Sequence, residues 1–251
     1  MKMEKIGKFF GGNFSKRTLI HYSIPIGMGL FYLFLSISRL LFPYVESYPY
    51  NWTTSMISRL GWPEVNTIGW IFFSLAFVIL GFLSIPLGAY YYRRFSPLNK
   101  IAAKFIRLFL YCMSLSLILL GLIPNFETED RIFMIIHGIN AIILLGGGFL
   151  MFLISFYLIL KEYFAKEHSV FNFPKKLVML YILIGIYEII CVTMLFISMA
   201  RYGKFGGHYI HDPSIPLFLS APLWEWQTMV LLLILIVLPC YIFPNEIEYK
   251  R

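Results

Sequence analysis

The segment from residue 208 to residue 212 holds the side chains best suited to bind a metal ion. His208 and His211 stand three residues apart, and Asp212 follows directly. Imidazole nitrogens and carboxylate oxygens are zinc ligands, and His137 could complete a histidine-rich set. Two histidines also occur together in many solvated loops, and three nearby glycines favour a pliable loop here. The sequence therefore predicts no resident cofactor, with a divalent metal such as zinc as the alternative.

Three further polar residues fall within long apolar stretches. Glu188 lies in the run YILIGIYEIICVTMLF, where a charge costs about 2.5 to 3.5 kcal/mol, so the carboxyl must face other helices, stay protonated or find a partner. It is a candidate for proton relay or substrate binding, or for a neutral hydrogen-bonding contact between helices. His137 and Asn140 share one helix face. They are candidates for a metal ligand, a proton carrier or a head-group contact. The alternative is that His137 is a buried histidine hydrogen-bonded across helices.

Membrane-spanning helices must position these residues. Of the 251 residues, 59% are hydrophobic and only 14% charged, with a mean hydropathy of +0.74, whereas a soluble domain has about 25% charged residues. This composition excludes a soluble globular domain and a disordered chain, and three cysteines cannot form a disulfide scaffold. Crossing a hydrocarbon core of about 30 Å takes roughly 20 apolar residues, and six segments are long enough.

The predicted fold is therefore an all-α, six-helix bundle forming one transmembrane domain, residues 18–243. A basic lead, 1–17, precedes it, and a tail, 244–251, follows it. The predicted spans are about 19–42, 68–91, 105–123, 132–160, 177–200 and 223–243.

Basic residues are concentrated on one side of these spans. Sixteen of the 21 Lys and Arg residues fall in the lead, the second and fourth connections with their helix ends, and the tail. The positive-inside rule then predicts a multi-pass protein of the cell membrane with both termini cytoplasmic. The net charge of +8 is mainly a signal of this topology, so membrane lipids or other membrane subunits are the expected partners and nucleic acid is not.

Four short motifs, in order along the chain, carry a resemblance to a known family. They are Ser58-Arg59-Leu60-Gly61 with Asn66, Gly121-Leu122-Ile123-Pro124, His137, and Leu223-Trp224-Glu225-Trp226. Together they resemble a bacterial and archaeal six-helix membrane family of unknown function, grouped with the DRAM, Frag and Sfk membrane proteins. Relatives in that wider group are associated with lipid organisation and glycolipid-anchor remodelling, so the resemblance implies a lipid-related role. The histidine loop at 201–214 departs from the family pattern, and no family chemistry carries over to it.

The motif residues share one location, at or just inside the outer ends of the predicted spans. We therefore expect an outward-facing polar pocket, through which the protein binds or organises lipid or joins a membrane complex. The alternative is a metal-dependent intramembrane enzyme acting on lipid or a lipid-linked substrate, and a second alternative is a proton-coupled transporter that uses Glu188. The candidate pocket residues are Ser58, Arg59, Asn66, His137, Asn140, Glu188 and Glu225.

Overall fold

The structure, a computed structural model, describes residues 10–12, 15–43, 50–123, 131–165, 170–171, 173–202 and 216–244. It contains six helices long and apolar enough to span a membrane, which confirms the prediction of an all-helical chain with six such helices. The first consists of α2 (Lys16–Thr18), a π-helical turn η1 (Leu19–Ser23) and α3 (Ile24–Leu40). The others are α4 (Gly69–Phe95), α5 (Lys100–Leu122), α6 (Arg131–Phe164), α7 (Lys175–Tyr202) and α8 (Ala221–Ile242).

The π-helical turn has a local cause in the sequence. Pro25 stands at the start of α3 and has no N–H to donate to the carbonyl four residues earlier. A widened turn, with hydrogen bonds between residues five apart, accommodates that gap without ending the helix. The first span therefore continues without interruption from Lys16 to Leu40.

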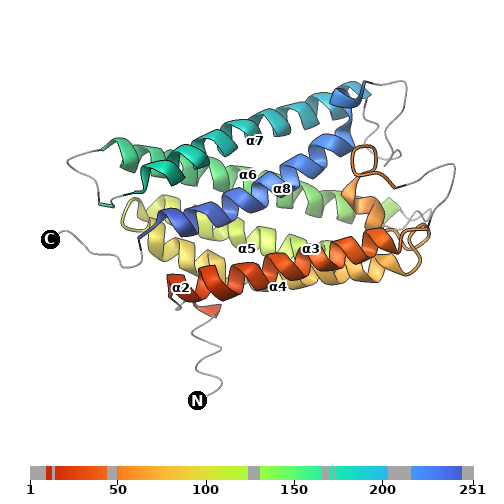
Figure 1. Ribbon diagram of the computed structural model, residues 1–251, viewed down its shortest axis with the longest axis horizontal. Helices are drawn as coiled ribbons and strands as arrows, with labels where there is room; N and C mark the ends of the chain where they lie inside the picture. Colours follow the sequence, from red (N-terminus) through yellow and green to blue (C-terminus); the bar gives the residue numbers. More distant parts are fainter. Residues whose placement is uncertain are drawn as a thin grey trace, which may run out of the picture.

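Figure 1 shows α7 along one long edge of the bundle and α3 with α4 along the other, while α8 passes between them. In chain order, α3 packs on α4, α4 on α5 and α5 on α6, and α8 packs on α7 and less extensively on α6. The two ends of the bundle differ in character. We call the end with residues 16–19, 93–107, 161–165 and 173–176 the basic end, and the end with residues 50–68 the loop end.

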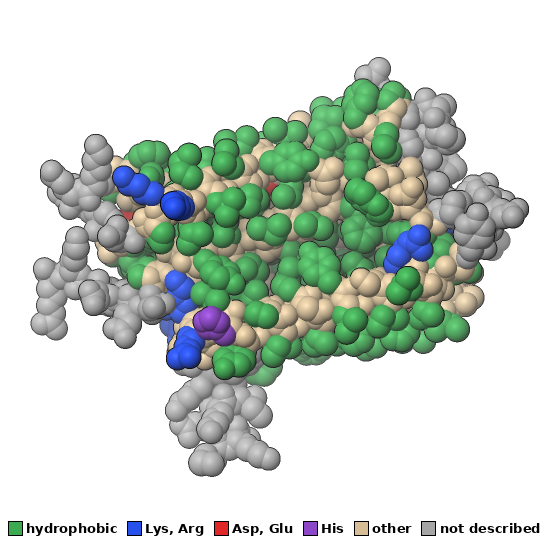
Figure 2. Space-filling view, viewed as in Figure 1, with side chains coloured by type: hydrophobic (Ala, Val, Ile, Leu, Met, Phe, Trp, Pro, Cys, Tyr) green, Lys and Arg blue, Asp and Glu red, His purple; other side chains and the backbone are tan. Residues whose placement is uncertain are grey.

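The basic end gathers most of the described cationic side chains, and Figure 2 shows Lys and Arg concentrated there. They are Lys16, Arg17, Arg93, Arg94, Lys100, Lys104, Arg107, Lys161, Lys175 and Lys176, whereas the loop end has only Arg39 and Arg59 among the described side chains. Between the two ends the surface is predominantly apolar (Figure 2). This is the distribution that a membrane-spanning bundle needs.

The most extensive helix contact, between α4 and α5, depends on glycine. A Cβ atom at Gly81 would lie 2.8 Å from the Ser114 backbone oxygen, and one at Gly121 would lie 2.6 Å from the Ser74 backbone oxygen. Small residues of this kind let two membrane helices approach closely. The connection between the two helices ends at Asn99, whose side chain caps α5 by accepting hydrogen bonds from the Ile101 and Ala102 amides at 3.0 Å.

The first and last spans are joined at the basic end. Lys16 donates from Nζ to the carbonyl oxygens of Tyr241 at 3.0 Å and Phe243 at 2.5 Å. Arg94, from α4, donates to the Pro244 carbonyl oxygen at 3.1 Å. Cations at a helix C-terminus satisfy carbonyls that have no partner within the helix and complement its dipole. This contact fixes the end of α8 against α2 and α4.

Candidate functional site

Four of the predicted pocket residues meet at one short segment at the loop end, two within it and two in contact with it. Residues 57–61 form a 3-10 helix, η2 (Ile57–Gly61), that contains Ser58 and Arg59. Glu225, in the second turn of α8, accepts a hydrogen bond from the Ile57 amide at 2.9 Å through Oε2. Asn66 donates from Nδ2 to the Leu60 carbonyl at 2.7 Å. We call residues 50–66 and their contacts with α3 and α8 the loop-end junction.

The start of α8 holds this segment through three side chains. Besides the Glu225 contact, Trp226 donates from Nε1 to the Ser55 carbonyl at 3.1 Å, and Ser220 donates from Oγ to the Thr53 carbonyl at 2.8 Å. The loop groups that these side chains contact, the Ile57 amide and the Ser55 and Thr53 carbonyls, all belong to the backbone. The loop therefore keeps one shape against α8 without requiring particular side chains of its own at these points.

On the α3 side, Asn66 makes the equivalent contacts. Its side chain is fully buried, and Nδ2 also lies 3.3 Å from the Ser38 carbonyl oxygen and 3.2 Å from Ser38 Oγ. Asn66 Oδ1 is buried and has no hydrogen-bond partner among the described residues. Asn66 therefore joins the loop to α3 chiefly as a donor.

Arg59 and Tyr50 form the interior of the junction. Arg59 is 3% exposed, donates to Ser55 Oγ at 3.2 Å and places its guanidinium carbon 5.0 Å from the centre of the Phe42 ring. Burial lowers the pKa of Arg59, although an arginine keeps its charge at any relevant pH. Burial also raises the pKa of the Tyr50 phenol, and the nearby Glu225 carboxylate adds to that effect. Tyr50 therefore stays protonated and donates to the Met56 carbonyl at 3.3 Å.

The Glu225 contact leads to a graded prediction. Replacing Glu225 with alanine removes the acceptor for the Ile57 amide and should reduce the free energy of unfolding by about 1 to 2 kcal/mol. Glutamine retains an acceptor oxygen and should lose less than half as much. Hydrogen exchange of the Ile57 amide measures this directly: we expect fast exchange in E225A and slow exchange in E225Q. Equal protection in E225A and the wild type would show that Glu225 does not hold the loop.

The remaining predicted pocket residues are placed separately. Ser58 is half-buried in η2. His137, on α6, is 8% exposed and has a hydrogen bond with the backbone of Ile123 at the end of α5, while its Nδ1 is buried without a partner in the described structure. Asn140 donates to the Ile136 carbonyl of its own helix at 3.0 Å. His137 therefore connects α6 to α5, and Asn140 shares its buried face.

Glu188 lies in the middle of α7 on the face that packs against the bundle. Its side chain is fully buried. The same face carries Tyr181, whose hydroxyl lies 2.9 Å from Ser155 Oγ of α6, and Gly185, where a Cβ would contact the Phe152 ring at 2.8 Å. The structure therefore orients Glu188 toward the other helices, one of the three possibilities raised by the sequence.

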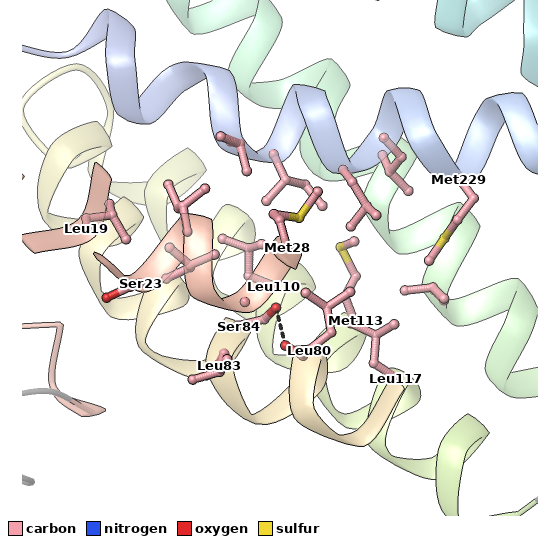
Figure 3. A pocket seen from close by; sticks show the side chains of 18 residues that line it. Leu19, Ser23, Met28, Leu80, Leu83, Ser84, Leu110, Met113, Leu117 and Met229 are labelled. Carbon is pink, nitrogen blue, oxygen red and sulfur yellow. Dashed lines mark hydrogen bonds between the residues drawn. The ribbon is translucent and has the colours of Figure 1, made fainter. Parts of the chain in front are cut away.

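A cavity between the helices was not predicted from the sequence. It is lined by 18 residues of five spans, all apolar except Ser23 and Ser84. Ser84 donates to the Leu80 carbonyl at 2.7 Å, so its polar atom is satisfied within α4. Figure 3 shows Met28 of α3, Met113 of α5 and Met229 of α8 converging on this space. The cavity therefore offers a ligand an apolar wall of mixed aliphatic and thioether groups.

The cavity is narrow and opens sideways. The space along its wall is about 690 Å³ when the open region outside the mouth is included, and little of that space is wide enough to hold a water molecule. The partly exposed lining residues are Ser23, Ile24 and Met28 of the first span, Leu83 and Ser84 of α4, and Val237 of α8. Of these helices, α3 packs extensively on α4 but makes little contact with α8. The mouth of the cavity therefore lies on the side of the bundle between α3 and α8. The lining of the cavity extends toward the basic end as far as Leu19.

The predicted metal set is only partly within the described structure. His208, His211 and Asp212 lie outside the described residues, and so does Pro124 of the second motif. In the part of the chain that is described, no three His, Cys, Asp or Glu side chains are grouped as metal ligands. The zinc alternative therefore stays a prediction.

Comparison with known proteins adds no relative to these observations. The resemblance to the six-helix family of unknown function stays a prediction, as does the lipid-related role that it implies. No family model, no curated protein and no solved structure matches this chain.

Proposed function

We propose that this chain is a multi-pass membrane protein that binds a membrane lipid, with one acyl chain in the cavity between α3 and α8. The observation that carries the proposal is the cavity, whose lining is apolar (Figure 3). In a membrane, its mouth between α3 and α8 would face the bilayer. Apolar cavities stay free of water, and an empty one forfeits the dispersion contacts of its lining. A linear hydrocarbon chain fits a long, narrow space and is the apolar ligand that a bilayer supplies.

The charge distribution supports an orientation for this lipid. The basic end would be cytoplasmic by the positive-inside rule, with both termini on that side of the cell membrane. Because the lining extends from the middle of the bundle toward the basic end, the lipid would come from the cytoplasmic leaflet. The excess of Lys and Arg there favours a lipid with an anionic phosphate head group. Labelling of single cysteines introduced at each end would test the orientation independently.

Filling the cavity tests the proposal. Gly27 lines it, and a Cβ there would meet only Leu83, at 3.4 Å or more, so a leucine side chain can extend into the space. We expect Gly27→Leu to lower the amount of lipid that copurifies after a detergent wash by about tenfold, because the acyl chain and the new side chain compete for one volume. Native mass spectrometry of the full chain measures the lipid retained per protein.

The matched control lies two residues further along the same helix. Gly29 is exposed, and a Cβ there meets nothing within 4 Å. Gly29→Leu should therefore retain lipid at the wild-type level. Lipid retained equally by G27L and G29L, or no lipid retained by the wild type, would overturn the proposal that the cavity holds an acyl chain.

A further inference from the structure

Among the described carboxyl groups, Glu188 is the one that is buried without a hydrogen-bond partner. Both of its oxygens are buried and unpartnered among the described residues. Glu162 and Glu225 each accept a backbone hydrogen bond, from Phe171 at 2.6 Å and Ile57 at 2.9 Å respectively. The fourth described carboxyl, Glu64, is exposed at the loop end. Among the described carboxyl groups, Glu188 is therefore the one that is fully buried and receives no hydrogen bond.

The groups near Glu188 do not supply the missing donor. Cys191, one turn further along α7, donates its thiol toward Gln227 Oε1 of α8 at 3.8 Å, and Tyr187 donates its hydroxyl to the same oxygen. Gln227 Oε1 is therefore already occupied by two donors. The described Lys and Arg side chains lie at the two ends of the bundle. On α7 itself, Glu188 is 13 residues from Lys175, about 20 Å along the axis. A carboxylate at this position would be an uncompensated buried charge.

We propose that Glu188 is an intramembrane proton-binding site, which holds a proton in the packed α7–α8 arrangement described here. An ionised carboxylate without donors in an apolar interior is strongly disfavoured, so the neutral acid is the form compatible with this packing. Protonation also gives the side chain an O–H with which it can meet an acceptor on a neighbouring helix. Intramembrane carboxyls of this kind are the usual components of proton relays.

The backbone around Glu188 favours a proton over a metal cation. Alkali-cation sites in membrane helices use carbonyl oxygens released where a helix is unwound. α7 is continuous from Lys175 to Tyr202, so its carbonyls near Glu188 remain within the helix. One carboxyl and no released carbonyls cannot replace the hydration shell of a sodium ion.

The test uses a lipid-soluble carbodiimide, N,N′-dicyclohexylcarbodiimide, on the full chain in lipid nanodiscs. The protonated carboxyl adds across one C=N bond: its proton goes to nitrogen, its oxygen bonds to the central carbon, and the acyl group then migrates to nitrogen. The product is a stable N-acylurea, with no leaving group and no change of oxidation state. We expect this adduct at Glu188 with a preference of about tenfold or more over Glu162 in the same molecules, as read by peptide mass spectrometry.

Matched variants and a salt exchange complete the experiment. Glu188→Gln is neutral and nearly isosteric, so it should fold normally and show no adduct in this peptide, whereas Glu64→Gln should label as the wild type does. Replacing choline chloride with sodium chloride at constant pH should leave the labelling unchanged. Absence of an adduct at Glu188 in the wild type, or equal labelling of Glu162, would overturn the proposal. Protection by sodium would overturn it in favour of a cation site, and the wild-type peptide map decides even if E188Q fails to fold.

Discussion

Alanine in place of Gly81 or Gly121 is expected to lower the free energy of unfolding by about 2 to 3 kcal/mol at each position. The new methyl groups would lie 2.8 Å from the Ser114 backbone oxygen and 2.6 Å from the Ser74 backbone oxygen. A flexible side chain can rotate away from such a contact, but a helical carbonyl cannot. Relief therefore requires α4 and α5 to separate, which loosens packing along the most extensive helix contact of the bundle. Unfolding of the purified protein in mixed micelles with increasing denaturing detergent measures the loss.

Gly146→Ala is the control for this prediction. Gly146 lies within α6, and a Cβ there meets nothing within 4 Å. Alanine has the higher helix propensity, so G146A should be as stable as the wild type or slightly more stable. If G81A and G121A unfold at the same detergent fraction as G146A, the close approach of α4 and α5 is not what stabilises the bundle.

The second large effect is expected at the loop-end junction, from Asn66→Asp. The substitution keeps the shape of the side chain but puts an oxygen where Nδ2 now lies 2.7 Å from the Leu60 carbonyl and 3.3 Å from the Ser38 carbonyl. An ionised carboxylate there would face acceptors only, at a site with no exposure to solvent. We expect a loss of about 3 kcal/mol at neutral pH, because buried donors are lost and a buried charge is left uncompensated. The loss should shrink at low pH, where the protonated acid can donate once.

The same chemical change at Asn51 should have little effect. Asn51 is exposed, and its Oδ1 accepts hydrogen bonds from the Thr53 amide at 3.0 Å and the Thr53 hydroxyl at 2.9 Å. An aspartate retains both contacts, so Asn51→Asp should unfold within about 0.5 kcal/mol of the wild type. Equal stability of N66D and N51D, measured by thermal unfolding at pH 5 and pH 8, would contradict a donor role for Asn66.

The sequence was sufficient to predict features that depend on hydrophobicity along the chain. Six long apolar segments predicted six helices, and the cost of a charge in the fifth predicted that Glu188 would face the bundle or stay protonated. The sequence also grouped Arg59, Asn66 and Glu225 near one end. It could not identify the Ile57 amide as the partner of Glu225, because the two residues are 168 positions apart and the contact depends on how α8 packs.

For a related reason, the cavity could not have been predicted from the sequence. Gly27, Leu110 and Met229 line it, yet neither their residue types nor their spacing distinguishes them from residues that would face lipid. In a soluble protein, polarity separates exterior from interior, but a membrane bundle is apolar on both sides of each helix. Only the choice of neighbouring helices decides which apolar residues enclose a space. His208, His211 and Asp212 remain a sequence prediction, outside the described residues.

The contact between Lys16 and the end of α8 has a consequence for the order of assembly. Its two partners are separated by 225 residues, so at about 5 to 20 residues per second the ribosome needs roughly 10 to 45 s to complete it. In a membrane, the side of α3 that lines the cavity would be open to the bilayer throughout that interval. The wall of the cavity contributed by α8 arrives last, which means that a lipid can already occupy the space when the bundle closes. The lipid would then bind during biogenesis. It would take part in folding before it ever exchanged with other lipids of the bilayer.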